Sequence, residues 1–238
     1  MKNYRYLDLV TAFFVTVLII SNVASSAKVV DLHGSIFGIP LAFDGGTLLF
    51  PLSYIFGDVL TEVYGFKASR RVIWTGFAAL ALSAIVFFLL RALPSDPVWE
   101  GYAGSAAYDA ILGGMSTGGI VFASLAAYLL GEFSNSVVLS KVKILMKGKL
   151  LFVRTIGSTL VGEFVDSLIF ILIATLTGVF VWELFWTLVI TNYILKCLIE
   201  IIMTPLTYLA VHKLKKNEDV DVYDNGVRFN LFPLGGKQ

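Results

Sequence analysis

Long apolar runs recur along this chain, and their length limits the folds open to it. A helix needs about 20 residues to cross the hydrocarbon core of a bilayer. Six runs reach that length, and nothing charged lies between Arg71 and Arg91 in the third. The pattern predicts an all-α integral membrane protein with six transmembrane helices. The runs are Leu7–Ala27, Thr47–Tyr64, Val72–Leu93, Gly119–Ser140, Thr155–Val181 and Leu184–Val211.

Composition excludes most other classes of protein. The chain is 57% apolar and 15% charged, whereas soluble domains are about 45–50% apolar and about 25% charged. A net charge of +1 gives the chain no strong positive electrostatic field that would attract nucleic acid. One cysteine, Cys197, and two histidines cannot form an internal disulfide or a zinc site. The sequence also lacks phosphate-loop, His-Glu-x-x-His and Gly-x-Ser-x-Gly motifs. We therefore expect no enzyme, cofactor, metal or nucleic-acid partner.

The distribution of basic residues predicts the orientation in the cell (inner) membrane. Lys28 and Arg91 lie on one set of flanks, and thirteen cations lie on the other. Because cytoplasmic loops are enriched in Lys and Arg, both termini are expected in the cytoplasm. The thirteen are Lys2, Arg5, Lys67, Arg70, Arg71, Lys141, Lys143, Lys147, Lys149, Arg154, Lys213, Lys215 and Lys216.

The remaining segments predict short elements around one transmembrane domain, residues 1–212. Residues Val29–Gly46 should be irregular or a short hairpin. Residues Pro94–Gly118 suit a short helix at the membrane interface. Residues 213–238 form a polar cytoplasmic tail, in which Asn225-Gly226 is a type I′ hairpin signal.

Acidic residues inside the predicted spans outnumber the bases there. Lys196 is the single base within a span, and Arg154 stands at the start of another. An ionised group at mid-bilayer costs roughly 2.5–3.5 kcal/mol on insertion scales, and these cations cannot neutralise every acid. The excess predicts an acidic site within the membrane, suited to a donor-rich or cationic ligand. The acids are Asp58, Glu62, Glu132, Glu163, Asp166 and Glu200.

Structural interpretations of the same residues stay open. Asp58 and Glu62 could lie at the interface and cap Lys67 or Arg70. Lys196 and Glu200, spaced i and i+4, could form a structural ion pair. Asn135 and Ser136 could hold helices together.

Three motifs resemble one known family. The resemblance covers about residues 5–215, and it is to the queuosine precursor transporter family, also called the vitamin uptake transporter family. It rests on Phe50-Pro51-Leu52-Ser53-Tyr54 with Asp58-x-x-Thr61-Glu62-x-Tyr64-Gly65, on Gly131-Glu132-Phe133-Ser134-Asn135, and on Arg154-Thr155-Ile156-Gly157-Ser158 with Asp166-Ser167.

The resemblance implies uptake of 7-deazaguanine bases, the 7-cyano and 7-aminomethyl precursors of queuosine in tRNA, by secondary or facilitated transport. It also implies a six-helix fold similar to the vitamin-binding subunits of energy-coupling-factor transporters. A carboxylate can accept the N1–H and N2 amine of such a base together. The residues expected at the ligand are Glu132, Asn135, Asp166, Glu163, Lys196, Glu200, Asn22, Tyr128 and Phe170.

Within this set, Glu132, Asp166 and Asn135 are expected at the edge of the base. Lys196 and Glu200 are expected to hold the polar network or carry a coupling proton. A cytoplasmic gate is assigned to Asp58 and Glu62, latched by Arg70 or Arg154.

Two other functions and one assembly remain open. The chain could be the substrate-binding subunit of a shared-ATPase transporter, or a scaffold that transports nothing. Small-residue faces, Gly76, Ala79 and Ser83 or Gly119, Ala123 and Ala127, would allow close packing within the chain or in a homodimer.

Overall fold

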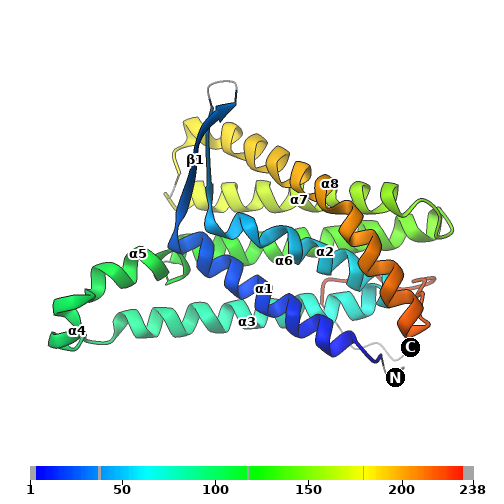
Figure 1. Ribbon diagram of the computed structural model, residues 1–238, viewed down its shortest axis with the longest axis horizontal. Helices are drawn as coiled ribbons and strands as arrows, with labels where there is room; N and C mark the ends of the chain where they lie inside the picture. Colours follow the sequence, from blue (N-terminus) through cyan, green and yellow to red (C-terminus); the bar gives the residue numbers. More distant parts are fainter. Residues whose placement is uncertain (1–3, 37–38, 117, 179, 233–238) are drawn as a thin grey trace.

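The computed structural model describes residues 4–36, 39–116, 118–178 and 180–232. They form an elongated helical bundle in which both ends of the chain lie at the same end of the molecule (Figure 1). In chain order the elements are α1 (Leu7–Ala27), β1 (Val29–Ile36), β2 (Ile39–Asp44), the 3-10 turn η1 (Gly45–Leu48), α2 (Phe50–Val59), the π-helical turn η2 (Leu60–Tyr64), α3 (Phe66–Ala92), α4 (Pro97–Tyr102), α5 (Gly104–Ser116), α6 (Gly118–Leu145), α7 (Leu151–Leu176), the 3-10 turn η3 (Trp182–Leu184) and α8 (Phe185–Glu218).

Five helical segments of the described chain are long and apolar enough to cross a membrane, so this is a multi-pass membrane protein. They are Leu7–Ala27, Phe66–Ala92, Gly104–Leu145, Leu151–Leu176 and Trp182–Glu218. The run Thr47–Tyr64, predicted as the second span, is not among them. Its helical part has only 10 residues in α2 and five in η2. It ends at Gly65, whose φ of 81° no longer fits a helix.

Several helix ends differ from the predicted spans. Helix α3 begins at Phe66 instead of Val72, and α6 continues five residues past Ser140. Helix α8 runs on through Pro205 to Glu218. The predicted spans followed apolar residues, whereas these helices continue into polar sequence that packs at the end of the bundle.

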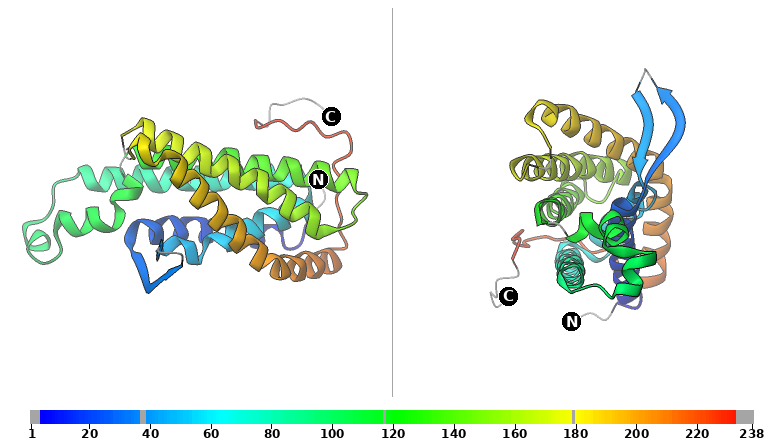
Figure 2. Two further views of the ribbon diagram at one scale, coloured as in Figure 1. Left: turned by 90° about the horizontal axis from the view of Figure 1, so that it is seen from above. Right: turned by 90° about the vertical axis from the view of Figure 1, so that its left-hand side faces the viewer.

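Helices α6 and α7 lie side by side and antiparallel, and α8 crosses over them (Figures 1 and 2). Glycines allow the close approach of α6 and α7. A Cβ added at Gly131 would lie 3.2 Å from the carbonyl oxygen of Gly162, and one added at Gly162 would lie 3.2 Å from that of Gly131. Small residues at such a crossing let two backbones meet inside a membrane.

The small-residue faces considered for a homodimer are used within this chain. A Cβ at Gly76 would lie within 3 Å of the Tyr128 hydroxyl and of Leu18. Ala123 and Ala127 are buried inside the bundle. Both faces therefore serve the internal packing of α3 and α6.

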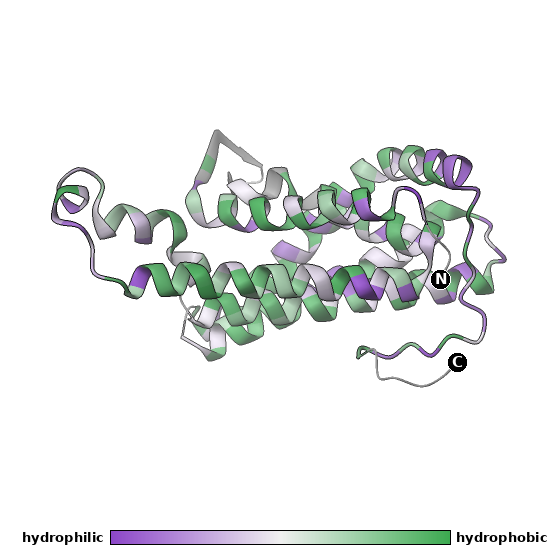
Figure 3. Cartoon of the chain, turned by 90° about the horizontal axis from the view of Figure 1, so that it is seen from below, coloured by the Kyte–Doolittle hydropathy of each residue, from purple (hydrophilic) through white to green (hydrophobic). Residues whose placement is uncertain are grey.

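Buried apolar side chains join the first part of the chain to α6. Phe14 and Leu18 of α1, Val59 of α2 and Ile73 of α3 belong to one cluster with Tyr128 of α6. Apolar side chains on the outer faces of the long helices are exposed, as expected where they would contact lipid. Figure 3, coloured by hydropathy, shows hydrophobic residues along much of the long helices.

At the end opposite the termini, β1 and β2 pair as an antiparallel hairpin, with Val29 opposite Asp44. The prediction of a short hairpin after α1 is confirmed. The segment Pro94–Gly118 contains two helices, α4 and α5, where one was predicted. The Asp96 side chain caps α4 by accepting from the backbone N–H of Val98 and Trp99.

At the end with the termini, the tail after α8 binds the bundle. The buried Asp224 carboxylate accepts from the Phe66 backbone N–H at 2.8 Å and from the Ser140 hydroxyl at 2.6 Å. The Val222 N–H donates to the Val63 carbonyl. Asn225-Gly226 form a turn, but within residues 219–232 the flanking residues form no strand pair. Their hydrogen-bonding groups contact the bundle instead, which is why the predicted hairpin is absent here.

Candidate ligand-binding cavity

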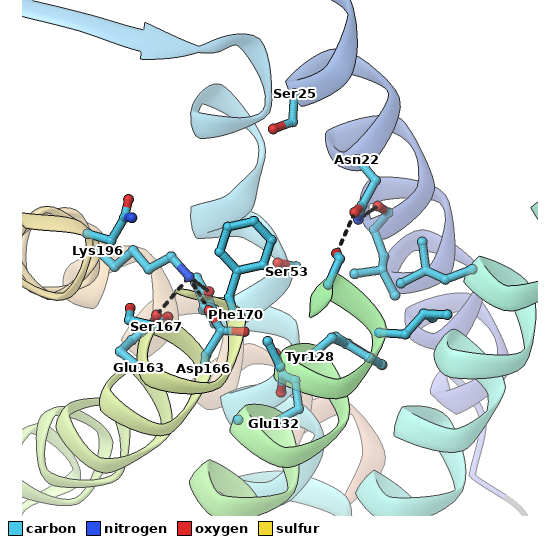
Figure 4. A pocket seen from close by; sticks show the side chains of 18 of the residues that line it. Asn22, Ser25, Ser53, Tyr128, Glu132, Glu163, Asp166, Ser167, Phe170 and Lys196 are labelled. Atoms are coloured by element: carbon cyan, nitrogen blue, oxygen red, sulfur yellow. Dashed lines mark hydrogen bonds and ion pairs between the residues drawn. The ribbon is translucent and has the colours of Figure 1, made fainter. Parts of the chain in front are cut away.

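A cavity of about 470 Å³ lies within the bundle, between α1, α2, α3, α5, α6, α7 and α8. Most of its surface is apolar, but α1, α2, α6, α7 and α8 each contribute polar or charged side chains to it (Figure 4). The cavity extends to Ser25 and Ser26 at the last turns of α1 and to Gly114 of α5. A cavity of this size is typical of a site for a small molecule.

One cation and two carboxylates form a cluster in the cavity wall. Figure 4 shows Lys196 reaching from α8 to α7, where it contacts Asp166 and lies 3.4 Å from Glu163. Its ammonium also lies 3.3 Å from the Tyr54 hydroxyl of α2. Among the described residues, no ion pair joins Lys196 to Glu200. The interpretation of these two as an i, i+4 pair is therefore wrong, because Lys196 points toward α7. We call Lys196, Glu163 and Asp166 the Lys196 cluster.

Glu132 presents hydrogen-bond acceptors to the cavity without a cation beside it. Its side chain is 4% exposed, and its Oε2 has no hydrogen-bond partner within the described chain. It packs against α2 where Gly57 leaves room, since a Cβ on Gly57 would lie 2.6 Å from Oε2. The carboxylate is thus held in place by shape and left free to accept from a ligand.

Asn135 connects the cavity to Asp58. Its Nδ2 donates to Asp58 Oδ1 at 2.8 Å, and its Oδ1 has no partner in the part of the chain described. Asn135 therefore both holds α2 to α6 and lines the cavity. Ser136 faces away, where its hydroxyl meets those of Thr61 and Ser69 at 3.0 and 2.9 Å. For Ser136 the prediction of a helix-holding role is confirmed.

The other expected ligand residues occupy the remaining wall. Asn22 of α1 accepts from the Ser124 hydroxyl at 3.2 Å. The Tyr128 hydroxyl donates to the Ile73 carbonyl at 3.1 Å, which fixes its ring beside the cavity. Phe170 of α7 lines the cavity close to the Lys196 cluster (Figure 4).

Glu200 does not line the cavity with these residues. It is 3% exposed and lies one helical turn beyond Lys196. Its spacing in the sequence placed it on the same helix face as Lys196, but the crossing of α8 over the bundle turns it toward buried carboxylates instead.

A second charged cluster lies on the terminal side of the cavity and has the opposite composition. The completely buried Glu62 carboxylate lies 2.6 Å from Lys215, 3.1 Å from Arg154 and 3.6 Å from Lys143. We call these four residues the Glu62 cluster. Asp58 is also completely buried, so both acids lie inside the bundle and not on its surface.

Of the two cations expected to latch these acids, the structure places one beside them. Arg154 contacts Glu62. Arg70 instead donates to the Asn230 carbonyl of the tail at 2.9 Å.

Sequence reasoning missed two members of the Glu62 cluster, Lys143 and Lys215. Both were counted only as orientation signals, since the spans were ended at Ser140 and Val211. Lys143 is 2% exposed and also donates to Asp221 of the tail at 2.6 Å. Burial alone would raise the pKa of Asp221, but hydrogen bonds from Lys143 and Lys215 hold that pKa below its ordinary value. If the helix predicted to end at Ser140 had been extended by one turn, Lys143 would have fallen within it. That extension is the sequence signal that could have identified Lys143.

Residues 44–210 match the family model described as "Putative vitamin uptake transporter". The chain belongs to this vitamin uptake transporter family. It is therefore a membrane transporter and not an enzyme, and its ligand is a small molecule.

Two curated relatives carry a more specific name. The chain is 26% identical over 192 residues to the "Probable queuosine precursor transporter" of Bacillus subtilis (strain 168), covering 80% of this chain and 79% of that protein. It is also 26% identical over 168 residues to the Haemophilus influenzae protein of the same name, covering 70% and 67%. No solved structure matches the chain.

Proposed function

We propose that this transporter imports the queuosine precursors 7-cyano-7-deazaguanine and 7-aminomethyl-7-deazaguanine for tRNA modification. The observation that carries the proposal is the cavity, in which the carboxylates of Glu132, Glu163 and Asp166 face one cation, Lys196. Such a lining suits a ligand that offers several N–H donors. The names of the two curated relatives agree with that ligand chemistry.

Glu132 is the acceptor best placed for the edge of the base. Its carboxylate lines the cavity and has no ion-pair partner in the described chain, so it can take the N1–H and the N2 amine of the base as a bidentate pair. Asn135 offers a second acceptor beside it. Lys196 and Asn22 supply donors for O6 and N3, and Asp166 keeps Lys196 at the cavity wall. Phe170 and Tyr128 provide aromatic surface for the flat ring.

The surplus of carboxylate also predicts a preference between the precursors. The aminomethyl form carries a positive charge, and the cyano form does not. A cavity lined by three acids and one base attracts the cation more strongly. The aminomethyl precursor should therefore bind more tightly.

The membrane topology belongs to the same proposal. Elements α2 and η2 run in the opposite direction to α1 and α3 (Figure 1), so they act as a short sixth crossing. The fold would then be the six-helix fold of vitamin-binding subunits of energy-coupling-factor transporters. Both termini lie in the cytoplasm of an inner membrane. Residues 1–212 form the transport domain, and residues 213–238 form the cytoplasmic tail.

This topology makes the Glu62 cluster a cytoplasmic gate. The cavity extends away from the termini, and Glu62, Arg154, Lys143 and Lys215 lie between it and the tail. The structure then corresponds to an outward-facing state. Asp58 belongs to the layer just above the gate, and Arg70 acts by binding the tail.

Transport in cells tests this proposal. In a strain that cannot make the precursors, the gene should restore queuosine in tRNA when either precursor is supplied in the medium. Glu132→Gln and Asp166→Asn should each reduce uptake by at least about 10-fold, the loss expected for one charge-assisted hydrogen bond. Glu183→Gln, an exposed substitution of the same kind on η3, should transport normally.

Thermal stability of the purified protein provides the second measurement. Binding raises the melting temperature of a folded protein, so both precursors should raise it. Normal transport by well-expressed Glu132→Gln and Asp166→Asn would show that the cavity residues are wrongly assigned. A thermal shift without transport, together with copurification of an ATPase, would make the chain a binding subunit. No shift and no transport would favour a scaffold.

A further inference from the structure

The buried acids of the bundle divide into those with a cationic partner and those without. Glu62 has three cations around it, and Lys196 is shared by Glu163 and Asp166. Within residues 4–36, 39–116, 118–178 and 180–232, four further buried acids have no ion-pair partner. Asp224 accepts hydrogen bonds from Phe66 and Ser140 where the tail meets the bundle. The other three are Asp58, Glu132 and Glu200, at 0%, 4% and 3% exposure.

Glu200 is buried on α8, which packs against α7 and α2. The charges of Asp58 on α2, Glu163 on α7 and Glu132 on α6 repel a negative charge on its carboxylate. Its Oε2 has no hydrogen-bond partner in the described chain. Lys196, one turn away on α8, is directed to α7. An ionised Glu200 would therefore meet repulsion from three directions.

Asp58 lies in the same layer and is linked to the cavity. Around it, Glu62 on its own helix and Glu163 on α7 add repulsion. Asn135 of α6 donates to its Oδ1, and its Oδ2 has no partner in the part of the chain described. Asn135 also lines the cavity and leaves its own Oδ1 open. A buried amide oxygen without a donor is the natural acceptor for the O–H of a protonated carboxyl group or for a ligand N–H.

A charged carboxylate at such a depth needs a cation or a bound proton. A metal ion would require several converging ligands. Among the described residues, no three His, Cys, Asp or Glu side chains are placed to hold one. A proton needs only one carboxyl oxygen and an acceptor beside it, which Asp58, Asn135 and Glu200 supply.

We propose that Asp58 and Glu200 form a proton-binding site beneath the ligand cavity, and that a proton bound there enters the cell with each substrate molecule. This proposal rests on the proposed transport function, and it adds the proton gradient as the driving force for that transport. The site loads from the outside through the cavity, with Asn135 between the ligand and Asp58. Opening of the Glu62 cluster then exposes the protonated carboxyl groups to the cytoplasm, where the proton leaves.

Purified protein in liposomes of phosphatidylethanolamine and phosphatidylglycerol tests the proton site. Radiolabelled 7-cyano-7-deazaguanine is the probe because it is uncharged, so any proton movement belongs to the protein. Exchange of labelled for unlabelled ligand across the membrane needs no gradient. Accumulation against a concentration gradient needs a driving force. With an acidic exterior, accumulation should exceed equilibrium at least fivefold, and a protonophore should abolish it.

Variants separate the proton site from ligand binding. Glu200→Gln should keep exchange near the wild-type rate and lose the acid-driven accumulation, since Gln cannot bind and release a proton. Asp58→Asn should likewise lose the acid-driven accumulation, since Asn at this position cannot bind and release a proton. The matched control, Glu183→Gln, changes an exposed carboxylate and should retain both activities.

The outcomes distinguish this proposal from the one it rests on. Exchange without any response to a pH gradient overturns the proton site and leaves the transport function intact. Accumulation driven by a sodium gradient, or acid-driven accumulation that survives in both Glu200→Gln and Asp58→Asn, also overturns it. Absence of exchange with both precursors overturns the proposed function and the proton site together.

Discussion

The two charged clusters of the bundle have opposite compositions. In the Lys196 cluster one cation serves two carboxylates, whereas in the Glu62 cluster one carboxylate serves three cations. The shared Lys196 is 26% exposed, whereas the shared Glu62 is completely buried with Arg154 and Lys143, each 2% exposed, and only Lys215 of that cluster reaches 24%. The first cluster keeps acidic groups available to a ligand. The charges of the second bind helices and tail to one another.

The cluster around the buried Glu62 carboxylate should be the more sensitive to loss of charge. Glu62→Gln removes the carboxylate paired with the buried Arg154, whereas Lys143 and Lys215 keep Asp221 as a counterion. Breaking a buried ion pair from one side costs about 3–5 kcal/mol. We expect this variant to show the largest loss of stability. Thermal unfolding in detergent, followed by tryptophan fluorescence, measures the effect. The exposed Glu183→Gln is the control, and equal melting temperatures for the two would remove the structural difference between the clusters.

Removing the cation from the Lys196 cluster should change transport more than stability. In Lys196→Met, Asp166 is 16% exposed and can be hydrated, whereas the loss of the ion pair at Glu163, which is 2% exposed, accounts for the stability cost. A charge-assisted hydrogen bond to the ligand is worth about 1.5–3 kcal/mol, so uptake of the cyano precursor should fall about 10- to 100-fold. The cationic aminomethyl precursor should lose less, because its charge replaces that of Lys196. Parallel uptake of both precursors measures this, and an equal loss for both would contradict the electrostatic account.

Adding a methyl group at Gly57 should test whether the Glu132 carboxylate needs the space beside α2. The added Cβ of Gly57→Ala would lie 2.6 Å from Glu132 Oε2. Overpacking of this kind costs about 1–3 kcal/mol, and we expect precursor binding to weaken about 10-fold. Gly157→Ala is the control, since no atom lies within 4 Å of its added Cβ. Calorimetric titration of both variants decides whether Glu132 needs the room that Gly57 leaves.

The smallest effect is expected where the Glu62 cluster meets the tail. Because the pKa of Asp221 lies below its ordinary value of 3.8, its ion pairs contribute fully above that pH. The contribution is lost as the pH falls through the lowered pKa. Asp221 is 43% exposed, so Asp221→Asn should cost less than about 1 kcal/mol. Hydrogen exchange of residues 220–224 should quicken in the variant at neutral pH, and unchanged exchange would mean that the pairs do not hold the tail.

The sequence identified the residues of the cavity more accurately than it identified the side chains that they contact. Depth along the apolar runs predicts Glu132, Asp166 and Lys196 near the middle of their spans, and the structure brings them around one cavity. Those features depend on local pattern, which a single chain contains. Partner choice depends on how helices rotate and cross. Glu200 shows this, since i+4 spacing relates it to Lys196 but the crossing of α8 separates their partners.

Helix ends were the other source of error. Hydropathy does not indicate that a helix continues into a polar segment that is buried by another part of the chain. Lys143 and Lys215 lie on such extensions. Both lie beside Glu62, and both also pair with Asp221 of the tail. The span predicted over residues 47–64 is shorter in the structure for a different reason. Gly45 and Gly46 precede its helical part, and Gly65 ends it, although the run is apolar.

The central claim is that Glu132, the cavity acid without a cation, binds the edge of a 7-deazaguanine base. Isothermal titration of 7-aminomethyl-7-deazaguanine into purified wild-type protein and Glu132→Gln tests it most directly. The account predicts binding to the wild type and an affinity about 10- to 100-fold lower in the variant, with an unchanged melting temperature. Equal affinity for the two proteins would contradict it.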